Sequence, residues 1–231
     1  MLSKPLKSLL DDITSFKFTS DIYFVGGTAL QVNINHRISY DIDLAVTDYK
    51  LDKGNIDKLV KYLESKGRTV KNMVSQSDID DFINDGEDIY DYQHDYNVDD
   101  IKLTLFAFGS SDKEREILIK DKSKPLGNIK IASVDALFKM KSLVLIKRHK
   151  SRDMFDLYHL IKERGYSVCD IFKNIKEYLP YSSIEIAKRR LSSSDMPFTD
   201  EGINPEEVGI EIEEIAEYFK KEISDLEKNK Y

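Results

Sequence analysis

The chain has 231 residues, of which 41% are hydrophobic and 33% charged, so its composition is that of a globular protein and excludes a disordered one. This length accommodates one large domain or two small ones. The formal net charge of −7 argues, taken alone, against a general binder of polyanions.

In the first 130 residues, helical and strand-like hydrophobic patterns alternate. The expected elements are helices over 6–13, 28–32 and 56–63 and strands over 22–25, 41–46, 69–74, 101–108, 117–120 and 129–131. After residue 133 the pattern predicts helices only, over 134–147, 152–163, 168–178, 183–191 and 205–227. We therefore expect an α+β fold with a sheet domain over 1–130 and a helical bundle domain over 131–231.

Several other features limit the class of protein. Cys169 is the only cysteine, which excludes an intrachain disulfide and a cysteine-rich zinc site. No run of about 18 apolar residues predicts a membrane-spanning helix, and residues 1–5 lack a secretory apolar region. We expect a cytoplasmic protein with no membrane partner.

The negative charge is concentrated in residues 78–100, which contain ten acids and no lysine or arginine. Without this segment the net charge becomes +3. Such a charge block is typical of a solvated surface insertion, and a lid or a docking surface for a basic protein is the alternative.

Positive charge gathers in a second region. Six basic residues lie within fourteen positions, namely Lys139, Lys141, Lys147, Arg148, Lys150 and Arg152. They could contact the phosphates of a nucleotide or an RNA, or they could form one solvated helix face.

The most informative segment begins where the strand over 22–25 ends in Gly26 and Gly27, followed by Thr28 and a helix. Glycines allow the backbone to approach a phosphate closely, and the start of a helix offers unpaired N–H groups and the positive end of the helix dipole. A glycine pair after a strand is more often a simple turn, so this feature alone is a weak signal.

Two aspartates, Asp41 and Asp43, follow on the next strand. Because side chains alternate along a strand, both carboxylates lie on one face, where they repel each other unless a cation lies between them. Mg²⁺ held by one or two carboxylates and by substrate phosphates is the natural occupant. A polar strand face is the simpler alternative for such a pair.

Together, these two features resemble the signature of the nucleotidyltransferase superfamily. The segments Gly26-Gly27-Thr28-Ala29-Leu30 and His36-Arg37-Ile38-Ser39-Tyr40-Asp41-Ile42-Asp43-Leu44 are similar to the AbiEii/AbiGii family of toxin nucleotidyltransferases. A second similar block contains Met140-Lys141-Ser142-Leu143, then Arg148, Lys150 and Arg152-Asp153-Met154-Phe155-Asp156-Leu157. The resemblance spans roughly residues 23–160.

The resemblance implies a nucleotidyltransferase-type mixed sheet domain with flanking helices, followed by a helical bundle. It also implies Mg²⁺-dependent (or Mn²⁺-dependent) transfer of NMP from an NTP to an acceptor, with RNA such as a tRNA 3′ end expected. The protein would be the toxin of a toxin–antitoxin or phage-defence system, with a cognate antitoxin protein as partner. Transfer to a small molecule or a protein, or a non-catalytic nucleotide-binding or partner-binding role, remains the alternative.

Candidate roles follow for the residues of the first motif. Gly26, Gly27 and Thr28 would hold the triphosphate, through the N–H groups of the turn and the threonine hydroxyl. Asp41 and Asp43 would be catalytic as the metal ligands.

The nucleotide-binding set has two further members between the glycines and the aspartates. Arg37, with its fork of donors, and Ser39 would lie near the phosphates. A solvated loop arginine is an equal alternative for Arg37.

The second block supplies four further candidates. Lys141 would be catalytic by neutralising phosphate charge, and Asp153 would be catalytic by orienting it. Arg152 and Asp156 would assist nucleotide binding from the same helix. The alternative is an ordinary helix start, where the dipole favours aspartate.

A third carboxylate, which would serve as general base, is not evident. The strand expected over 101–108 contains no acid, and Asp99 and Asp100 lie just before it. They are candidates, although the end of the acidic segment is the stronger explanation for them.

Overall fold

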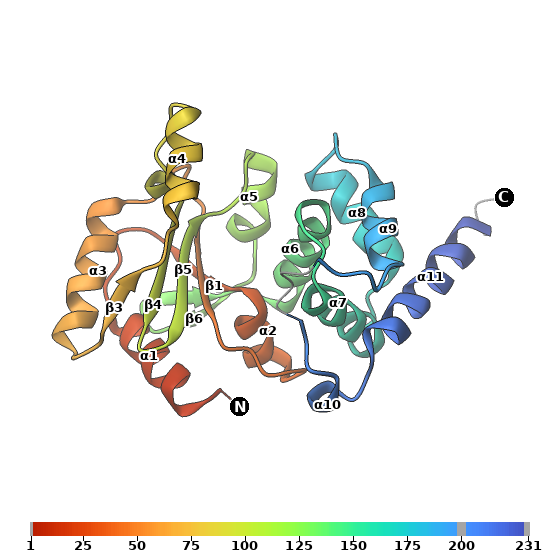
Figure 1. The fold of residues 1–231 in the computed structure, drawn as a ribbon, viewed down its shortest axis with the longest axis horizontal. Coiled ribbons are helices and arrows are strands. Elements are labelled where there is room, and N and C mark those ends of the chain that lie inside the picture. Colours follow the sequence, from red (N-terminus) through yellow and green to blue (C-terminus); the bar gives the residue numbers. More distant parts are fainter. Residues whose placement is uncertain (1, 198–201, 229–231) are drawn as a thin grey trace. The chain divides into compact units, whose positions relative to one another are not determined.

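The computed structural model describes residues 2–197 and 202–228, and the chain divides into two compact units, Met1–Val134 and Asp135–Tyr231 (Figure 1). The first unit contains the sheet and the second is helical. The division falls four residues after the boundary expected from the sequence, at the point where α6 (Val134–Lys147) begins.

The first unit is built on a mixed seven-stranded sheet with the order β3-β4-β5-β2-β1-β7-β6. The strands are β1 (Ile22–Val25), β2 (Ile42–Val46), β3 (Val70–Asn72), β4 (Gln93–Val98), β5 (Ile101–Ala107), β6 (Lys124–Leu126) and β7 (Ile129–Ile131). β2 pairs antiparallel with β1 and parallel with β5, and β1 pairs parallel with β7. The outer pairs, β3–β4, β4–β5 and β6–β7, are antiparallel.

One face of this sheet forms the apolar core of the first unit. Ile42 and Leu44 alternate with Asp43 along β2, and both are almost completely buried. Helices α1 (Lys4–Ser15) and α3 (Lys53–Ser65) lie together on one side of the sheet (Figure 1) and bury Leu9, Leu59 and Leu63 completely. Burial of each such side chain stabilises the fold by about 1.5–3 kcal/mol.

The remaining helices of the first unit are α2 (Gly26–Ile34), α4 (Gln76–Asn84), the 3₁₀ helix η1 (Ile89–Asp91) and α5 (Asp112–Ile119). The strand expected over 117–120 is wrong, because these residues complete α5. Ser111 caps this helix by accepting a hydrogen bond from the Glu114 backbone N–H at 3.3 Å. Acids in the first turn favour the helix further, through the helix dipole.

The acidic segment 78–100 is only partly a surface insertion. Its first part forms α4, which has no buried residue among those described. Its last part forms β4, where buried His94, Tyr96 and Val98 alternate with more exposed polar residues. The expectation of an insertion is therefore wrong for β4, which pairs with β5 over its whole length.

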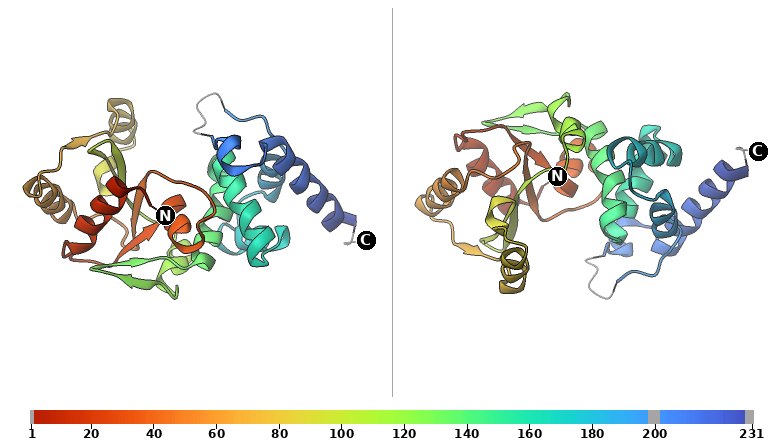
Figure 2. Two further views of the ribbon diagram at one scale, coloured as in Figure 1. Left: turned by 90° about the horizontal axis from the view of Figure 1, so that it is seen from below. Right: turned by 90° about the horizontal axis from the view of Figure 1, so that it is seen from above.

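The second unit consists of helices packed around a second apolar core. They are α6, α7 (Ser151–Arg164), α8 (Val168–Tyr178), α9 (Ile184–Leu191), α10 (Pro205–Val208) and α11 (Ile212–Lys228). α11 packs on α7, α8 and α9, and its course is visible from two further sides in Figure 2. The single helix expected over 205–227 is interrupted, because Gly209 adopts a left-handed conformation (φ 72°) and ends α10. None of the described helices combines the length and the apolarity needed to cross a bilayer.

Candidate active site

The glycine turn lies directly against the Asp-x-Asp strand. β1 ends at Val25, and Gly26, with a φ of +77°, starts α2 at once. A Cβ atom on Gly26 would overlap the carboxylate of Asp43. Glycine is therefore required here for two reasons, the left-handed backbone and the close approach of Asp43.

Gly27 brings two more of the predicted residues to the same place. A Cβ atom on Gly27 would lie 2.6 Å from Nη2 of Arg37 and 3.1 Å from Oγ of Ser39. The guanidinium of Arg37 also donates to the backbone carbonyl of Ile38 at 3.1 Å. The structure thus gathers Gly26, Gly27, Arg37, Ser39 and Asp43 around the start of α2.

Thr28 is placed differently from the expectation that its hydroxyl binds phosphate. The residue is 1% exposed, and its hydroxyl donates to the backbone carbonyl of Asp41. This bond ties the first turn of α2 to the residue before β2. In this structure Thr28 therefore positions Asp41.

Gln31 is a site residue that sequence reasoning missed. It is 3% exposed in α2, and its side-chain oxygen accepts a hydrogen bond from the backbone N–H of Ser39 at 2.9 Å. The contact holds the loop that carries Arg37 and Ser39 against α2. A buried amide needs such a partner, and its position within an apolar helix segment was the available signal.

The carboxylates of Asp41 and Asp43 fit a magnesium site. Both residues are half-buried, they lie two positions apart, and the missing side chain of Gly26 is what allows the carboxylate of Asp43 to approach the start of α2. Across residues 2–197 and 202–228, no three His, Cys, Asp or Glu side chains come together as a metal cluster. Two carboxylates suit Mg²⁺, whose remaining ligands are ordinarily substrate phosphates and water.

The candidates for a third carboxylate lie away from this pair. Asp43 pairs in register with Thr104 on β5, and Asp100 lies four residues earlier, about 13 Å along the strand direction. Asp99 accepts the backbone N–H of Thr69 at 2.8 Å and pairs with Arg68 at 3.2 Å. The hydrogen bond from Thr69 has the largest effect on the pKa of Asp99 and lowers it; burial opposes this effect, and Arg68 adds to the lowering.

The candidates in the second unit form a buried cluster of charges. Nζ of Lys141 lies 2.6 Å from Asp153 and 2.7 Å from Asp156, and Nε of Arg148 lies 2.7 Å from Asp153. Asp153 and Asp156 are both 0% exposed, and Lys141 is 7% exposed. We call these four residues the α6–α7 charge cluster. Its two positive and two negative charges balance.

The charge cluster strongly affects the ionisation of Asp153. Burial raises the pKa of its carboxyl, but Lys141 and Arg148 together outweigh that effect and lower it to about 2. Arg152 lies beside Asp153 in the first turn of α7 and is half-exposed.

At least three of the six basic residues between 139 and 152 have carboxylate partners. Lys141 and Arg148 bind the charge cluster, and Lys139 pairs with Asp135 at 2.6 Å. The positive patch expected there is therefore weaker than the sequence suggests.

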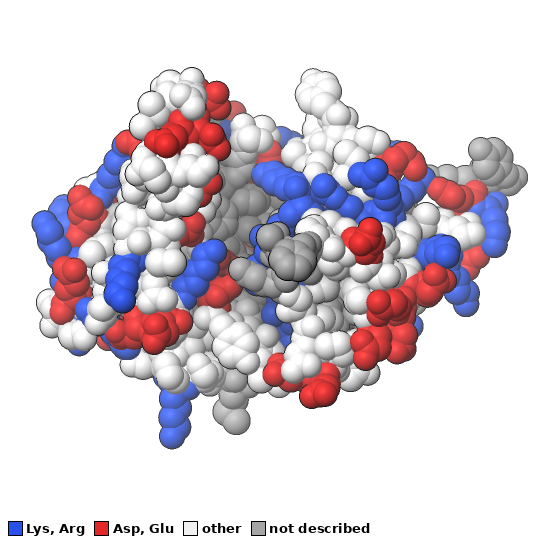
Figure 3. Space-filling model, in the orientation of Figure 1, with Lys and Arg blue, Asp and Glu red and all other residues white. Residues whose placement is uncertain are grey.

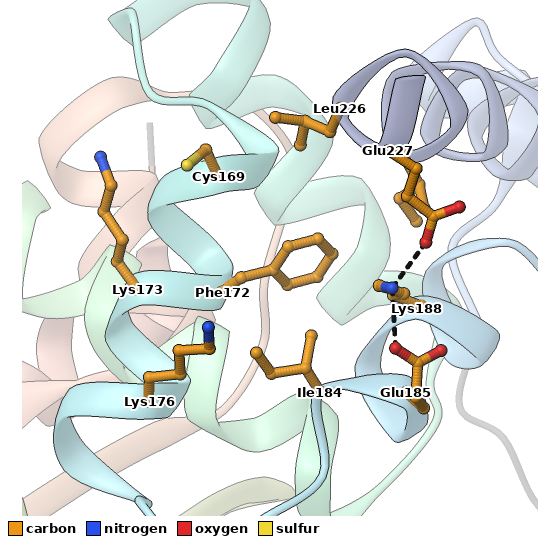
Figure 4. A pocket seen from close by; sticks show the side chains of 10 residues that line it. Cys169, Phe172, Lys173, Lys176, Ile184, Glu185, Lys188, Leu226 and Glu227 are labelled. Carbon is orange, nitrogen blue, oxygen red and sulfur yellow. Dashed lines mark hydrogen bonds and ion pairs between the residues drawn. The ribbon is translucent and has the colours of Figure 1, made fainter. Parts of the chain in front are cut away.

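A separate groove of about 380 Å³ lies between α8, α9 and α11 (Figure 4). Phe172 and Ile184 form part of its apolar lining, and lysines lie at its rim. Lys188 is held there by Glu185 at 2.7 Å and Glu227 at 2.6 Å. Figure 3 shows lysine and arginine side chains gathered over the region of α8 and α9. No residue predicted for the active site lines this groove.

A mixed sheet in which a glycine turn packs against an Asp-x-Asp strand defines the class of nucleotidyltransferases. The family model described as "Nucleotidyl transferase AbiEii toxin, Type IV TA system" matches residues 8–228. The chain therefore belongs to the AbiEii family of toxin nucleotidyltransferases, as its motifs predicted, and it is an enzyme of that class with an antitoxin as the second component of its system.

Individual relatives add the following comparisons. The chain is 26% identical over 233 residues to "Uncharacterized protein aq_aa25" of Aquifex aeolicus (strain VF5), covering 99% of this chain and 98% of that protein. JHP933 from Helicobacter pylori has a TM-score of 0.49 at 17% identity, with 99% of this chain and 97% of that one covered. MenT4, the nucleotidyltransferase toxin Rv2826c from Mycobacterium tuberculosis H37Rv, has a TM-score of 0.43 at 14% identity, with 94% and 84% covered.

Proposed function

We propose that this nucleotidyltransferase moves an NMP unit from an NTP to an RNA acceptor, such as the 3′ end of a tRNA, in a reaction that requires Mg²⁺ or Mn²⁺. The observation that carries the proposal is the convergence of Arg37, Ser39 and Asp43 on the glycines Gly26 and Gly27 at the start of α2. These groups offer phosphate-binding N–H donors, a guanidinium and a metal-binding carboxylate within one small region.

Each group has a separate task. The N–H groups at the start of α2 and the guanidinium of Arg37 would bind the triphosphate oxygens. Asp41 and Asp43 would hold the metal ion, which when bound neutralises charge on the phosphates and on the leaving pyrophosphate. Thr28 and Gln31 hold the segment that carries Ser39 and Asp41 against α2, because Thr28 bonds to Asp41 and Gln31 bonds to Ser39.

The role predicted for Lys141 in the second unit, a cation for the phosphates, stays a prediction, because this lysine is buried and its charge is balanced by Asp153 and Asp156. Arg152, which is half-exposed, would contact the nucleotide or the RNA from the same helix as Asp153. The second motif of the sequence supports this role for Arg152.

The biological outcome would be toxicity, because blocking an RNA 3′ end prevents its use. The NTP and RNA substrates imply that the protein acts in the cytoplasm. An antitoxin protein would counteract the reaction. A small-molecule or protein acceptor, and a non-catalytic relative that binds nucleotide or a partner, remain the competing functions.

The test is to incubate the purified protein with Mg²⁺, each α-labelled NTP in turn, and total RNA, protein and metabolite fractions as acceptors. Label should enter RNA, and Asp41→Ala and Asp43→Ala should each reduce transfer about 1,000-fold or more. Asp80→Ala, at an exposed aspartate of α4, is the matched control and should transfer at the normal rate.

Label found only in the protein fraction or only in the metabolite fraction would show that the acceptor is a protein or a small molecule and not an RNA. NTP binding without pyrophosphate release from any fraction would support the non-catalytic relative. Transfer that persists in both aspartate variants would refute the assignment of the metal ligands.

A further inference from the structure

A row of polar side chains continues from Asp43 across the sheet. Asp43 on β2 pairs in register with Thr104 on β5, and Thr104 pairs with Asp95 on β4. Residues that are directly paired across neighbouring strands point to the same face of a sheet. The three side chains therefore lie side by side on the face that carries the metal-binding pair.

Asp95 is held in this row by two hydrogen bonds. The hydroxyl of Thr104 donates to Oδ1 at 2.6 Å, and the side-chain amide of Gln93 donates to Oδ2 at 2.5 Å. Each carboxylate oxygen can accept more than one hydrogen bond, so both retain capacity for a further donor. Asp95 is half-buried and thus accessible to a ligand on this face.

The spacing of the row excludes Asp95 as a third metal ligand. Neighbouring strands lie about 4.8 Å apart, which places Asp95 about 10 Å from Asp43, whereas Mg²⁺ holds its ligands at about 2 Å. Accordingly, no three-residue metal cluster occurs among residues 2–197 and 202–228. A hydroxyl bound over β5 would nevertheless lie between the two carboxylates.

The strand order also matches the geometry of an in-line displacement. From one side to the other, the sheet places the glycine turn at β1, Asp43 on β2, Thr104 on β5 and Asp95 on β4. With the β- and γ-phosphates at the turn and the α-phosphate at Asp43, the nucleophile must approach from the side opposite the leaving group. That side is β5 and β4.

We infer that Asp95 accepts the proton of the attacking acceptor hydroxyl, and that Thr104 is the residue that positions its carboxylate. The inference rests on the proposed function and names the general base for it. The hydroxyl oxygen forms a bond to the α-phosphorus as the bond from that phosphorus to the bridging oxygen breaks. Pyrophosphate leaves with the electron pair, and the proton passes to Asp95, which becomes a neutral carboxylic acid.

The experiment compares the pH dependence of transfer in Asp95→Asn, Thr104→Val and the wild type. Asparagine preserves the shape of the side chain and can still accept from Thr104, so the variant should fold. We expect kcat to fall about 100- to 10,000-fold, with the KM for NTP unchanged and the loss of rate at low pH less steep, because the metal-binding carboxylates still have to be ionised. Thr104→Val should lower kcat about tenfold, and Thr104→Ser, which keeps the hydroxyl, should restore it.

Asp80→Asn removes a charge from the same acidic segment at an exposed position and should leave rate and pH profile unchanged. Asp95→Glu retains the carboxylate and should retain the low-pH loss of rate, which tests the proposal even where Asp95→Asn is unstable. If Asp95→Asn has a normal rate and pH profile, Asp95 is not the general base, and the proposed function is unaffected. A wild type that binds NTP but transfers nothing would overturn the proposed function, and this inference with it.

Discussion

The two units use the same kinds of charged side chain in opposite ways. In the first unit, Asp41 and Asp43 are half-buried, and Asp43 lies against the glycine turn at the start of α2. In the second, Asp153 and Asp156 are fully buried and their charges are balanced by Lys141 and Arg148. The comparison teaches that burial and partners decide which charged residues are available to a substrate and which stabilise the fold.

The largest expected effect comes from breaking the α6–α7 charge cluster. Asp153→Asn removes the carboxylate that both Lys141 and Arg148 contact, and leaves Asp156 as the one remaining carboxylate of the charge cluster against two positive charges. The free energy of unfolding should fall by about 3–5 kcal/mol, measured by urea denaturation. Asp43→Asn is the matched change in the first unit and should alter it by no more than about 1 kcal/mol. Equal losses in the two variants would contradict the contrast between the units.

Lowering the pH should also destabilise the second unit through its α6–α7 charge cluster. The pKa of Asp153 is about 2 in the folded protein against 3.8 for the free side chain, so its contribution to stability is present above about pH 4. This contribution, about 2 kcal/mol, is lost as the pH falls from 4 through 2, because the carboxyl is protonated more readily in the unfolded chain. Urea midpoints measured across this range should show the loss in the wild type and a smaller one in Asp153→Asn. Urea midpoints that fall equally with pH in the wild type and in Asp153→Asn would contradict the assignment of this stability to Asp153.

A smaller effect on stability, with a large effect on activity, is expected at the glycine turn. Gly26→Ala places a Cβ at positive φ and against Asp43, so we expect a loss of about 1–2 kcal/mol and a fall in transfer of about 100-fold. Gly67 also has positive φ (85°), but a Cβ there meets nothing within 4 Å. Gly67→Ala should therefore lose similar stability and keep full activity. Loss of activity in both variants would indicate strain, and not the contact with Asp43, as the cause.

Much of the fold could be predicted because its patterns are local. α6 and α8 have the expected bounds, and β1 and β2 follow from short apolar runs beside glycine and aspartate. The strand expected over 117–120 failed because a short apolar run suits a buried strand and a buried helix equally. β4 was hidden by its charges, although its residues alternate regularly in burial.

Some residues of the candidate site could likewise be predicted from the sequence, and others could not. Gly26, Gly27, Asp41 and Asp43 could be selected from sequence because each residue type has a chemical reason to be there. The row from Asp43 through Thr104 to Asp95 could not, because it depends on the pairing of β5 with the distant strand β2 and on β4, whose charges hid it in the sequence. The buried state of Lys141 also required the packed structure, since a lysine in a basic segment is ordinarily exposed.

The two outermost strands of the sheet have a consequence for the behaviour of the protein at high concentration. β3 and β6 contain three residues each, and they include Lys71 and Pro125 respectively. Short edges interrupted by a lysine or a proline give a neighbouring molecule few backbone groups with which to extend the sheet. Both edges of the sheet are therefore poor partners for a further strand, which disfavours aggregation through strand pairing between molecules.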